Sequence, residues 1–227
     1  MNALVWLLVG LASLTPSGSP EPALVVGVAQ VAPTWEGDLP AGVRSLRLAI
    51  EVRRGYDRDL FRHWVDRDSD GCDTRDEVLI AEATTGPSVG DDCTLSRGSW
   101  TSYYDAASTR DSSTLDIDHM VPLAEAWDSG ARAWNAGTRE RFANDLGDVR
   151  SLVAVTASAN RSKSDQDPVE WMPAREGCRY VRQYVAVKIR WSLTVDRAEK
   201  RFLRSKAASC PDVTLTVRKA SIGSSAN

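Results

Sequence analysis

The chain has 227 residues, of which 42% are hydrophobic and 26% charged, as expected for a globular protein with one domain of ordinary size. It contains no internal repeat or low-complexity segment, which excludes a repeat or fibrous architecture. The net charge of −3 gives the chain as a whole no general affinity for nucleic acid.

The charge is distributed unevenly along the sequence. Residues 175–219 contain 12 Lys and Arg against 4 Asp and Glu, so this segment has a net charge of +8 and the remainder one of −11. A basic segment beside an acidic body predicts one of two arrangements. Its side chains face phosphate groups, or they pair with acidic surfaces of the same protein.

Residues 1–40 are predicted to be a signal peptide and a linker. An apolar run from Ala3 to Leu14 has signal-peptide length and precedes a stretch rich in Pro, Ser and Gly. No Lys or Arg precedes this run, and a second apolar run at 23–32 obscures the cleavage point. Each run is too short to span a bilayer alone. We predict a secreted or extracytoplasmic protein without a stable membrane partner, with a retained N-terminal anchor as the alternative.

The four cysteines agree with an oxidising compartment. None lies in a C-x-x-C pair, which argues against a zinc site. Their order suggests the local bridges Cys72–Cys93 and Cys178–Cys210, one of three possible connectivities. The second bridge also has a structural reason, because two predicted C-terminal helices would form an antiparallel pair with Cys178 and Cys210 at its outer ends.

Residues 41–212 are expected to form one α+β domain, and residues 213–227 a flexible tail. The first half of the domain predicts helices at 56–65 and 76–84, a hairpin or strand pair at 91–105, and a strand at 113–121 that Pro122 ends. The second half predicts a helical or irregular crossing at 122–134, a short helix at 138–146, a buried strand at 150–156, a helix from 158 that Pro168 limits, and a helix pair at 178–193 and 196–210.

The stretch DIDHMVPL, residues 116–123, contains one of the two histidines of the chain. Hydrolysis of a phosphodiester bond needs a base that takes a proton from water and a cation that offsets charge on the phosphate. His119 suits the base, because an ordinary pKa of about 6.5 leaves the neutral form available. Asp118 and the amide oxygen of Asn160 are oxygen ligands of the kind that Mg²⁺ prefers. Strand neighbours point to opposite faces, so Asp118 and His119 share a site only where the strand ends, as Pro122 indicates.

Together with LVAVTASANRSKSDQDPVEW at 152–171, this stretch resembles the ββα-metal, or HNH, nuclease motif. The resemblance is closest to the HNH family that shares the C-terminal domain of GmrSD-type restriction enzymes, also called DUF1524. The HNH domain of the RNA-guided CRISPR nuclease carries similar strings. Looser resemblance to secreted members extends from Tyr56 to Cys210. The resemblance implies an α+β fold with a ββα-metal core, additional helices and a C-terminal helix pair.

By position, the resemblance implies that His119 is the general base of a secreted metal-dependent endonuclease. Asp118 and Asn160 would then bind Mg²⁺ or Mn²⁺, and Lys163 and Arg161 would lie beside the substrate. The family indicates a nucleic acid substrate, with DNA favoured over RNA. The basic C-terminal helices would hold its backbone. The oligomeric state is not predicted.

One position of the HNH pattern has no aligned counterpart. Many HNH proteins carry a middle asparagine just before or on the second strand of the core. The corresponding region here is NDLGDVRSL, residues 144–152, where Asn144 is a candidate and Ser151 sits at the expected spacing. Either residue is therefore a candidate for bracing the metal loop.

A second motif, DRDSDGCDTRDE at 66–77, fits the calcium-loop pattern D-x-D-x-D-G-x₅-E. Its candidate ligands are Asp66, Asp68, Asp70 and Glu77, with helices predicted on both sides. The alternative to a nuclease is therefore a non-catalytic extracellular module that binds Ca²⁺ through this loop.

Other features of the loop argue against calcium binding. Asp73 stands where such loops usually carry an apolar residue, and Arg67 and Arg75 offset part of the acidic charge. Arg75 would then reach a substrate phosphate or pair with Asp73. In the simplest interpretation, the segment is a solvated turn held by a bridge at Cys72.

Overall fold

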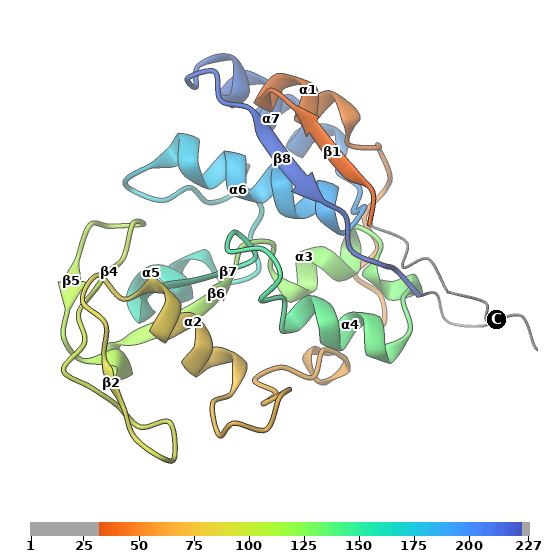
Figure 1. Cartoon of the computed structure of the whole chain (residues 1–227). Helices are drawn as coiled ribbons and strands as arrows, with labels where there is room; N and C mark the ends of the chain where they lie inside the picture. The colour runs from red at the N-terminus through yellow and green to blue at the C-terminus, as the bar shows by residue number, and fades with distance from the viewer. Residues whose placement is uncertain (1–31, 224–227) are drawn as a thin grey trace, which may run out of the picture. The chain divides into compact units, whose positions relative to one another are not determined.

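The computed structural model describes residues 32–223, so most of the predicted signal peptide and linker lies outside the described part (Figure 1). Residues 32–223 form an α+β fold with seven α-helices and four antiparallel two-stranded sheets. The expected fold class is therefore confirmed at this level. The chemistry-bearing motifs fall on one of these strand pairs and on the helix that follows it.

Strands β6 (Leu115–His119) and β7 (Leu152–Thr156) pair antiparallel, with Asp118 opposite Val153 and His119 opposite Leu152. Helix α5 (Ala157–Lys163) follows β7 directly and begins at Thr156, whose side chain accepts a hydrogen bond from Ala159 N. Both α5 and α2 (Thr74–Glu82) contact the strand pair, which explains why the first four residues of β7 are buried. The strands and helices predicted in these places are confirmed.

The connection between β6 and β7 is mostly helical. It contains α3 (Leu123–Asp128), a short 3-10 helix (Ala131–Ala133) and α4 (Ala136–Ala143). Its aromatic rings pack into the main hydrophobic core, where Phe142 contacts both Trp134 and Trp191. This connection brings the end of α4 back to the end of β6, which matters for the site below.

The C-terminal helix pair is α6 (Gly177–Arg190) and α7 (Arg197–Ala208). Helix α1 (Leu39–Ser45) contacts both of these helices, and the three lie together in Figure 1. The disulfide Cys178–Cys210 joins the outer ends of the pair, with a Cα–Cα distance of 5.5 Å. The second bridge is Cys72–Cys93, so the predicted connectivity is confirmed.

The tail is partly ordered, contrary to expectation. Strand β8 (Leu215–Arg218) pairs antiparallel with β1 (Thr34–Gly37), and the two lie side by side in Figure 1. Leu215 and Val217 are buried on this pair. The predicted linker and the predicted flexible tail therefore each contribute a strand, because Trp35 of β1 packs against the core that Leu215 and Val217 of β8 enter.

The helix predicted at 56–65 is absent. A 3-10 helix at Arg58–Leu60 is followed by irregular chain, and Trp64 has a left-handed φ of 58°. The apolar spacing is misleading because Phe61 packs in the main core while Trp64 packs in a second, smaller cluster. The pattern therefore does not come from one helix face.

The strand pair predicted at 91–105 is also incorrect in detail. β3 (Leu95–Ser96) pairs with β2 (Ser88–Val89), whereas β4 (Trp100–Thr101) pairs with β5 (Ser108–Thr109). The segment thus contributes one strand to each of two small hairpins.

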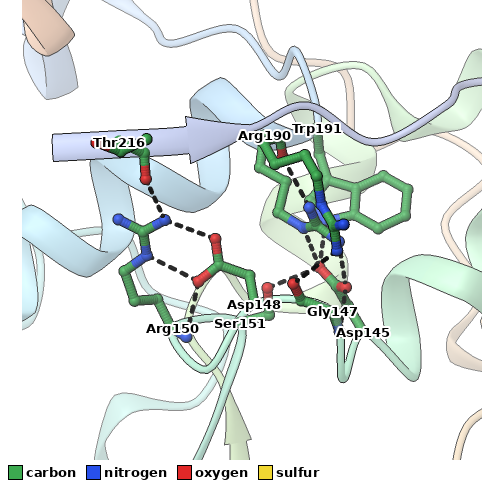
Figure 2. A network of polar contacts seen from close by, with 9 residues as sticks. Asp145, Gly147, Asp148, Arg150, Ser151, Arg190, Trp191 and Thr216 are labelled. Carbon is green, nitrogen blue, oxygen red and sulfur yellow. Dashed lines mark hydrogen bonds and ion pairs between the residues drawn. The ribbon is translucent and has the colours of Figure 1, made fainter. Parts of the chain in front are cut away.

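A buried network around Asp145 joins the end of α6 to the loop before β7 (Figure 2). Arg190 donates two hydrogen bonds of 2.7 Å to the Asp145 carboxylate, and Trp191 Nε1 and Ser151 Oγ donate to the same group. Beside it, Arg150 pairs with Asp148 and donates to the backbone oxygen of Thr216 in β8. Part of the basic C-terminal segment therefore pairs with acidic groups of the same chain, as one of the two charge arrangements predicts.

Candidate active site

A cavity of about 340 Å³ lies at the carboxyl end of β6. Its walls come from β6, the start of α3, helix α5 with the turn after it, and the segment around Arg58. Asp118, His119, Asn160 and Arg161 all line it. The structure thus brings together two pairs of residues that are about forty positions apart in the sequence.

His119 is buried and held in one orientation. Its Nε2 lies 2.9 Å from the backbone oxygen of Ala143, at the end of α4. A carbonyl oxygen only accepts hydrogen bonds, so Nε2 carries the proton in the neutral ring and Nδ1 carries the lone pair. Burial lowers the pKa of His119 to about 3, so the ring is neutral at neutral pH but binds a proton less readily than an exposed histidine does.

Aromatic rings pack against His119. The Trp64 ring stacks on it at a centroid distance of 5.7 Å, and the Phe142 ring is nearly parallel to it at 6.4 Å. Trp64 adopts this position with the left-handed backbone conformation noted above, which costs free energy for a bulky residue. His63 lies edge-on to His119 at 6.3 Å, and its own Nδ1 is 2.8 Å from the backbone oxygen of Phe61.

Asp118 is buried and bound on both oxygens. Lys163 Nζ donates to Oδ1 at 2.8 Å, and the Tyr104 hydroxyl donates to Oδ2 at 2.5 Å. The same ammonium group donates to the backbone oxygen of His119 at 2.8 Å. Burial raises the pKa of Asp118 against the opposing effect of Lys163, and burial lowers the pKa of Lys163.

Asn160 and Arg161 sit over a second acidic side chain of β6. Asn160 Nδ2 donates to Asp116 Oδ2 at 3.1 Å, and Arg161 Nε lies 3.6 Å from the same oxygen. The hydrogen bond to Asp116 orients the Asn160 amide and leaves its carbonyl oxygen available to a cation. The side chain of Arg161 is 77% exposed, so it is free to contact a substrate.

Two residues do not take the positions expected for phosphate contacts. Lys163 is fully buried between Asp118 and the His119 backbone. Arg75 donates from Nη2 to the backbone oxygens of Ser112 and Leu115, where it holds the start of β6. Both side chains have internal partners that satisfy their charge or their donors, so neither prediction agrees with the geometry.

The candidate for the middle asparagine has a clear structural role. Asn144 Oδ1 accepts from Val65 N at 3.1 Å, and its Nδ2 donates to the Arg62 backbone oxygen at 2.8 Å. It therefore braces the segment that carries His63 and Trp64 against His119. Ser151, the other candidate, donates instead to Asp145.

Sequence reasoning missed three residues of this site. Asp116 precedes Asp118 by two positions on the same strand face, so strand periodicity is a signal that could have found it. Tyr104 lies on a loop after β4, and its contact with Asp118 has no local signature in the sequence. Trp64 falls on a predicted helical stripe, which indicates packing alone.

The acidic loop before α2 has part of the geometry that calcium needs. One carboxylate oxygen from each of Asp66, Asp68 and Asp70 lies within 4.8 Å of the others. Glu77 lies on α2, and burial and these three aspartates raise its pKa. The predicted helix before the loop is absent, since the chain there is irregular. The turn is held by the Cys72–Cys93 bridge and by backbone hydrogen bonds to Asp66.

Comparison with known proteins assigns the chain to a family. Residues 76–206, more than half of the chain, match the C-terminal domain of GmrSD restriction endonucleases, and the protein belongs to this family. It is 42% identical over 158 residues to an uncharacterized secreted protein of Arthroderma benhamiae, covering 69% of this chain and 76% of the relative. No solved structure matches the chain significantly.

The family assignment confirms the resemblance stated from the sequence. The secreted relative and the two disulfides confirm the predicted secreted location. Within residues 32–223, no helix is both long enough and apolar enough to cross a membrane.

Proposed function

We propose that the protein is a secreted, metal-dependent endonuclease of the HNH type that hydrolyses phosphodiester bonds, with DNA as its substrate. The observation that carries the proposal is the shared cavity of His119 and Asn160, in which the Ala143 carbonyl holds the His119 ring in one orientation. The arrangement of β6, β7 and α5 agrees with a ββα-metal core. The choice of DNA over RNA follows from the restriction endonucleases of the family.

In this proposal His119 takes the proton from the attacking water. Its Nε2 stays bound to the Ala143 carbonyl, so Nδ1 receives the proton and the ring does not rotate. Trp64 and Phe142 keep the ring plane fixed, which reduces the conformational freedom lost when the water is aligned with phosphorus. Arg161 contributes an exposed charge that contacts the phosphate backbone.

The oxygen donors of the site fit a hard divalent cation such as Mg²⁺ or Mn²⁺. Asp118 and the Asn160 carbonyl oxygen would hold it, and Asp116 adds a carboxylate that contacts Asn160. Each carboxylate oxygen has two lone pairs, so Asp118 can accept from Lys163 and Tyr104 and still bind a cation. The bound cation supplies charge that offsets the negative charge developing on the phosphate.

The test is nicking of supercoiled plasmid with Mg²⁺. We expect H119A to lose at least about 10²-fold in rate, the usual effect of removing a general base. H63A is the comparison variant, because His63 is the other histidine and packs beside His119 without lining the cavity; we expect a much smaller loss than in H119A. Unfolding temperatures of both variants establish that each is folded. Near-native nicking by folded H119A would remove the base assignment.

A chelator tests the metal requirement separately. We expect EDTA to abolish nicking and excess Mg²⁺ or Mn²⁺ to restore it, because the proposed chemistry needs a cation at the phosphate. Undiminished cleavage in EDTA would exclude a metal-dependent mechanism. Plasmid, single-stranded RNA and a small phosphodiester, assayed in parallel, compare the substrate classes.

A second candidate function is a non-catalytic module that binds Ca²⁺ through the loop at 66–77. The clustering of the Asp66, Asp68 and Asp70 oxygens favours it. A wild-type protein that binds Ca²⁺ through this loop and never nicks plasmid would support the second candidate.

A further inference from the structure

Six carboxylates gather on the side of α3 that faces the C-terminal helices, outside the cavity described above. They come from the segment after α1, from α3, from the turn after α5, and from the start of α7. They form two groups that share one residue, and they are Glu51, Glu125, Asp128, Asp167, Asp196 and Glu199. Segments distant in the sequence therefore bring a high density of negative charge together.

One of these groups has the dimensions of a calcium site. Single carboxylate oxygens from Glu51, Asp167, Asp196 and Glu199 all lie within 4.8 Å of one another. Ca²⁺ binds oxygen at about 2.3–2.6 Å, so two oxygens on one ion are at most about 4.6–5.2 Å apart. The four oxygens can therefore ligate a single ion without a large movement of the backbone.

A buried oxygen without a hydrogen bond belongs to the same group. Glu199 is 0% exposed, and its Oε1 accepts no hydrogen bond from the described residues. Lys188 Nζ forms an ion pair with this oxygen at 3.1 Å, and it donates hydrogen bonds to Glu125 Oε1, the Thr194 backbone oxygen and Glu199 Oε2. In the neighbouring group, buried Asp128 likewise has an oxygen, Oδ1, without a hydrogen bond from the described residues.

Protein cations do not balance this charge. In the described residues Lys188 pairs with Glu125 and Glu199, and Arg53 pairs with Asp128. Arg53 is shared with Asp165 at 2.6 Å, which draws part of its charge away. Buried carboxylates are stabilised by pairing, by a bound metal or by a proton, and a further cation would offset the negative charge that remains in this cluster.

Solvent reaches the group directly. A cavity of about 520 Å³ is lined by Leu48, Ala49, Ile50, Glu51, Asp196 and Arg197. Glu51 itself is exposed, and Asp167 and Asp196 are half-buried. An ion can therefore enter the group from solution in the folded protein.

We propose that Glu51, Asp167, Asp196 and Glu199 form a binding site for one Ca²⁺ ion, separate from the proposed catalytic site. The ligands are all oxygens on irregular segments and helix ends, which suits the flexible coordination of Ca²⁺ better than the strict octahedron of Mg²⁺. The ion ties residues 48–51 and the turn after α5 to the first turn of α7. Asp167 lies two residues beyond Asp165, which lines the catalytic cavity, so the ion fixes the chain that follows α5.

The test measures Ca²⁺ binding and thermal unfolding, and it needs no nuclease activity. Protein freed of metal with EDTA and dialysed is titrated with CaCl₂, and Ca²⁺ stoichiometry and the unfolding temperature are recorded. We expect Ca²⁺ to raise the unfolding temperature with a Kd of about 10⁻⁴–10⁻³ M or tighter, the range of extracellular calcium modules. MgCl₂ at the same concentration should have a much smaller effect.

Two matched double variants locate the site. E51Q/D167N removes two ligand charges at exposed or half-buried positions, so the fold is retained and the stoichiometry should fall by one with loss of the thermal shift. D68N/D70N removes two charges from the loop at 66–77, and it should keep the shift. In the absence of Ca²⁺, E51Q/D167N should unfold at a higher temperature than wild type, since it relieves repulsion.

The opposite pattern overturns the proposal. A thermal shift that persists unchanged in E51Q/D167N, or that disappears only in D68N/D70N, would assign the calcium effect to another site. The absence of any Ca²⁺-dependent shift in wild type would also end it. None of these outcomes depends on whether the protein cleaves DNA.

Discussion

Lys163 and Asp118 form a buried ion pair at the edge of the cavity, and each is the other's counter-charge. This pairing keeps the Lys163 side chain buried, although the residue lies on a helix at the end of the motif. Its ammonium group binds Asp118 and the backbone of His119 at once, so it fixes the relative position of the proposed ligand and the proposed base. We therefore infer that Lys163 positions these two groups and does not contact phosphate.

Replacement of Lys163 by methionine tests this role. K163M leaves the Asp118 carboxylate buried beside an uncharged chain, and we expect a loss of about 3–5 kcal/mol in the free energy of unfolding. R161A, on the exposed face of the same helix, should change it by less than about 0.5 kcal/mol. The double variant D118N/K163M should be more stable than the sum of the single changes predicts. Urea denaturation measures these variants beside D118N and wild type, and equal stability of K163M and R161A would contradict the assignment.

Glu82 gives a pH-dependent prediction away from the site. Burial raises the pKa of Glu82 to about 7 from 4.5, although Ala154 N donates to its carboxylate at 2.7 Å. Between these pH values the folded chain holds a proton that the unfolded chain releases, so folding stability falls as pH rises from about 5 to 8. We expect E82Q to reduce this fall by roughly 1–3 kcal/mol. Urea denaturation at pH 5 and pH 8 measures this fall in stability for E82Q and wild type, with the exposed variant E170Q as the control. The same pH dependence in E82Q and wild type would contradict the prediction.

At the scale of elements, the β1–β8 pair extends the ordered fold to both ends of the described chain. Val217 is fully buried on this pair, whereas Val213, two residues before β8, is 43% exposed. V217A removes two buried methyl groups, and we expect a loss of about 2 kcal/mol. V213A should cost less than about 0.5 kcal/mol. Similar unfolding midpoints for V217A and V213A would mean that the tail is loose.

The sequence predicts best those helices and strands whose hydrophobic pattern has a single structural explanation. β7 is an apolar run buried on both sides, β6 ends before Pro122, and α6 and α7 have strong one-sided periodicity. The prediction for residues 56–65 is wrong because two clusters together produce a helical spacing. β1 and β8 escape prediction because each is four residues long and gains its stability from a partner about 180 positions away.

The candidate active site could be predicted from the sequence to a similar extent as the fold. The grouping of Asp118, His119 and Asn160 around one cavity follows from the two motifs, and the cavity is present. Their roles remain predictions. The Tyr104 contact, the burial of Lys163 and the stacking of Trp64 depend on loops whose path no local pattern specifies. The contacts of Arg75 could not be predicted either, since its partners are backbone oxygens about forty residues away.

At the scale of the whole molecule, the basic C-terminal segment serves two purposes. Lys188 and Arg190 of α6 are buried and pair with acidic side chains from other parts of the chain. The basic residues on the outer face of α7 have no such burial, and they are Arg197, Arg201, Arg204 and Lys206. Most of the exposed charge on this helix pair therefore lies on α7, with Arg179 at the start of α6, and these residues are available for the proposed grip on the nucleic acid backbone.

Salt dependence of DNA binding tests this role of α7. Binding is measured with the H119A variant, so that substrate stays intact, between low and physiological salt. The slope of log K against log salt is expected to shrink by about 0.9 for each phosphate that the protein no longer neutralises, and therefore by up to about 2 in H119A/R201A/R204A. An unchanged slope would show that α7 does not touch the DNA backbone.

The two disulfides connect stability to the time and place of folding. They close segments separated by 21 and 32 residues, and removal of each is expected to cost about 3–4 kcal/mol by the chain-entropy argument. Together this is comparable to the net stability of an average domain, about 5–15 kcal/mol. We therefore expect the reduced chain to be much less stable than the oxidised one, and largely unfolded in a reducing cytosol. For the endonuclease proposed above, this dependence on disulfides would delay activity until after export and so protect the DNA of the cell that produces it.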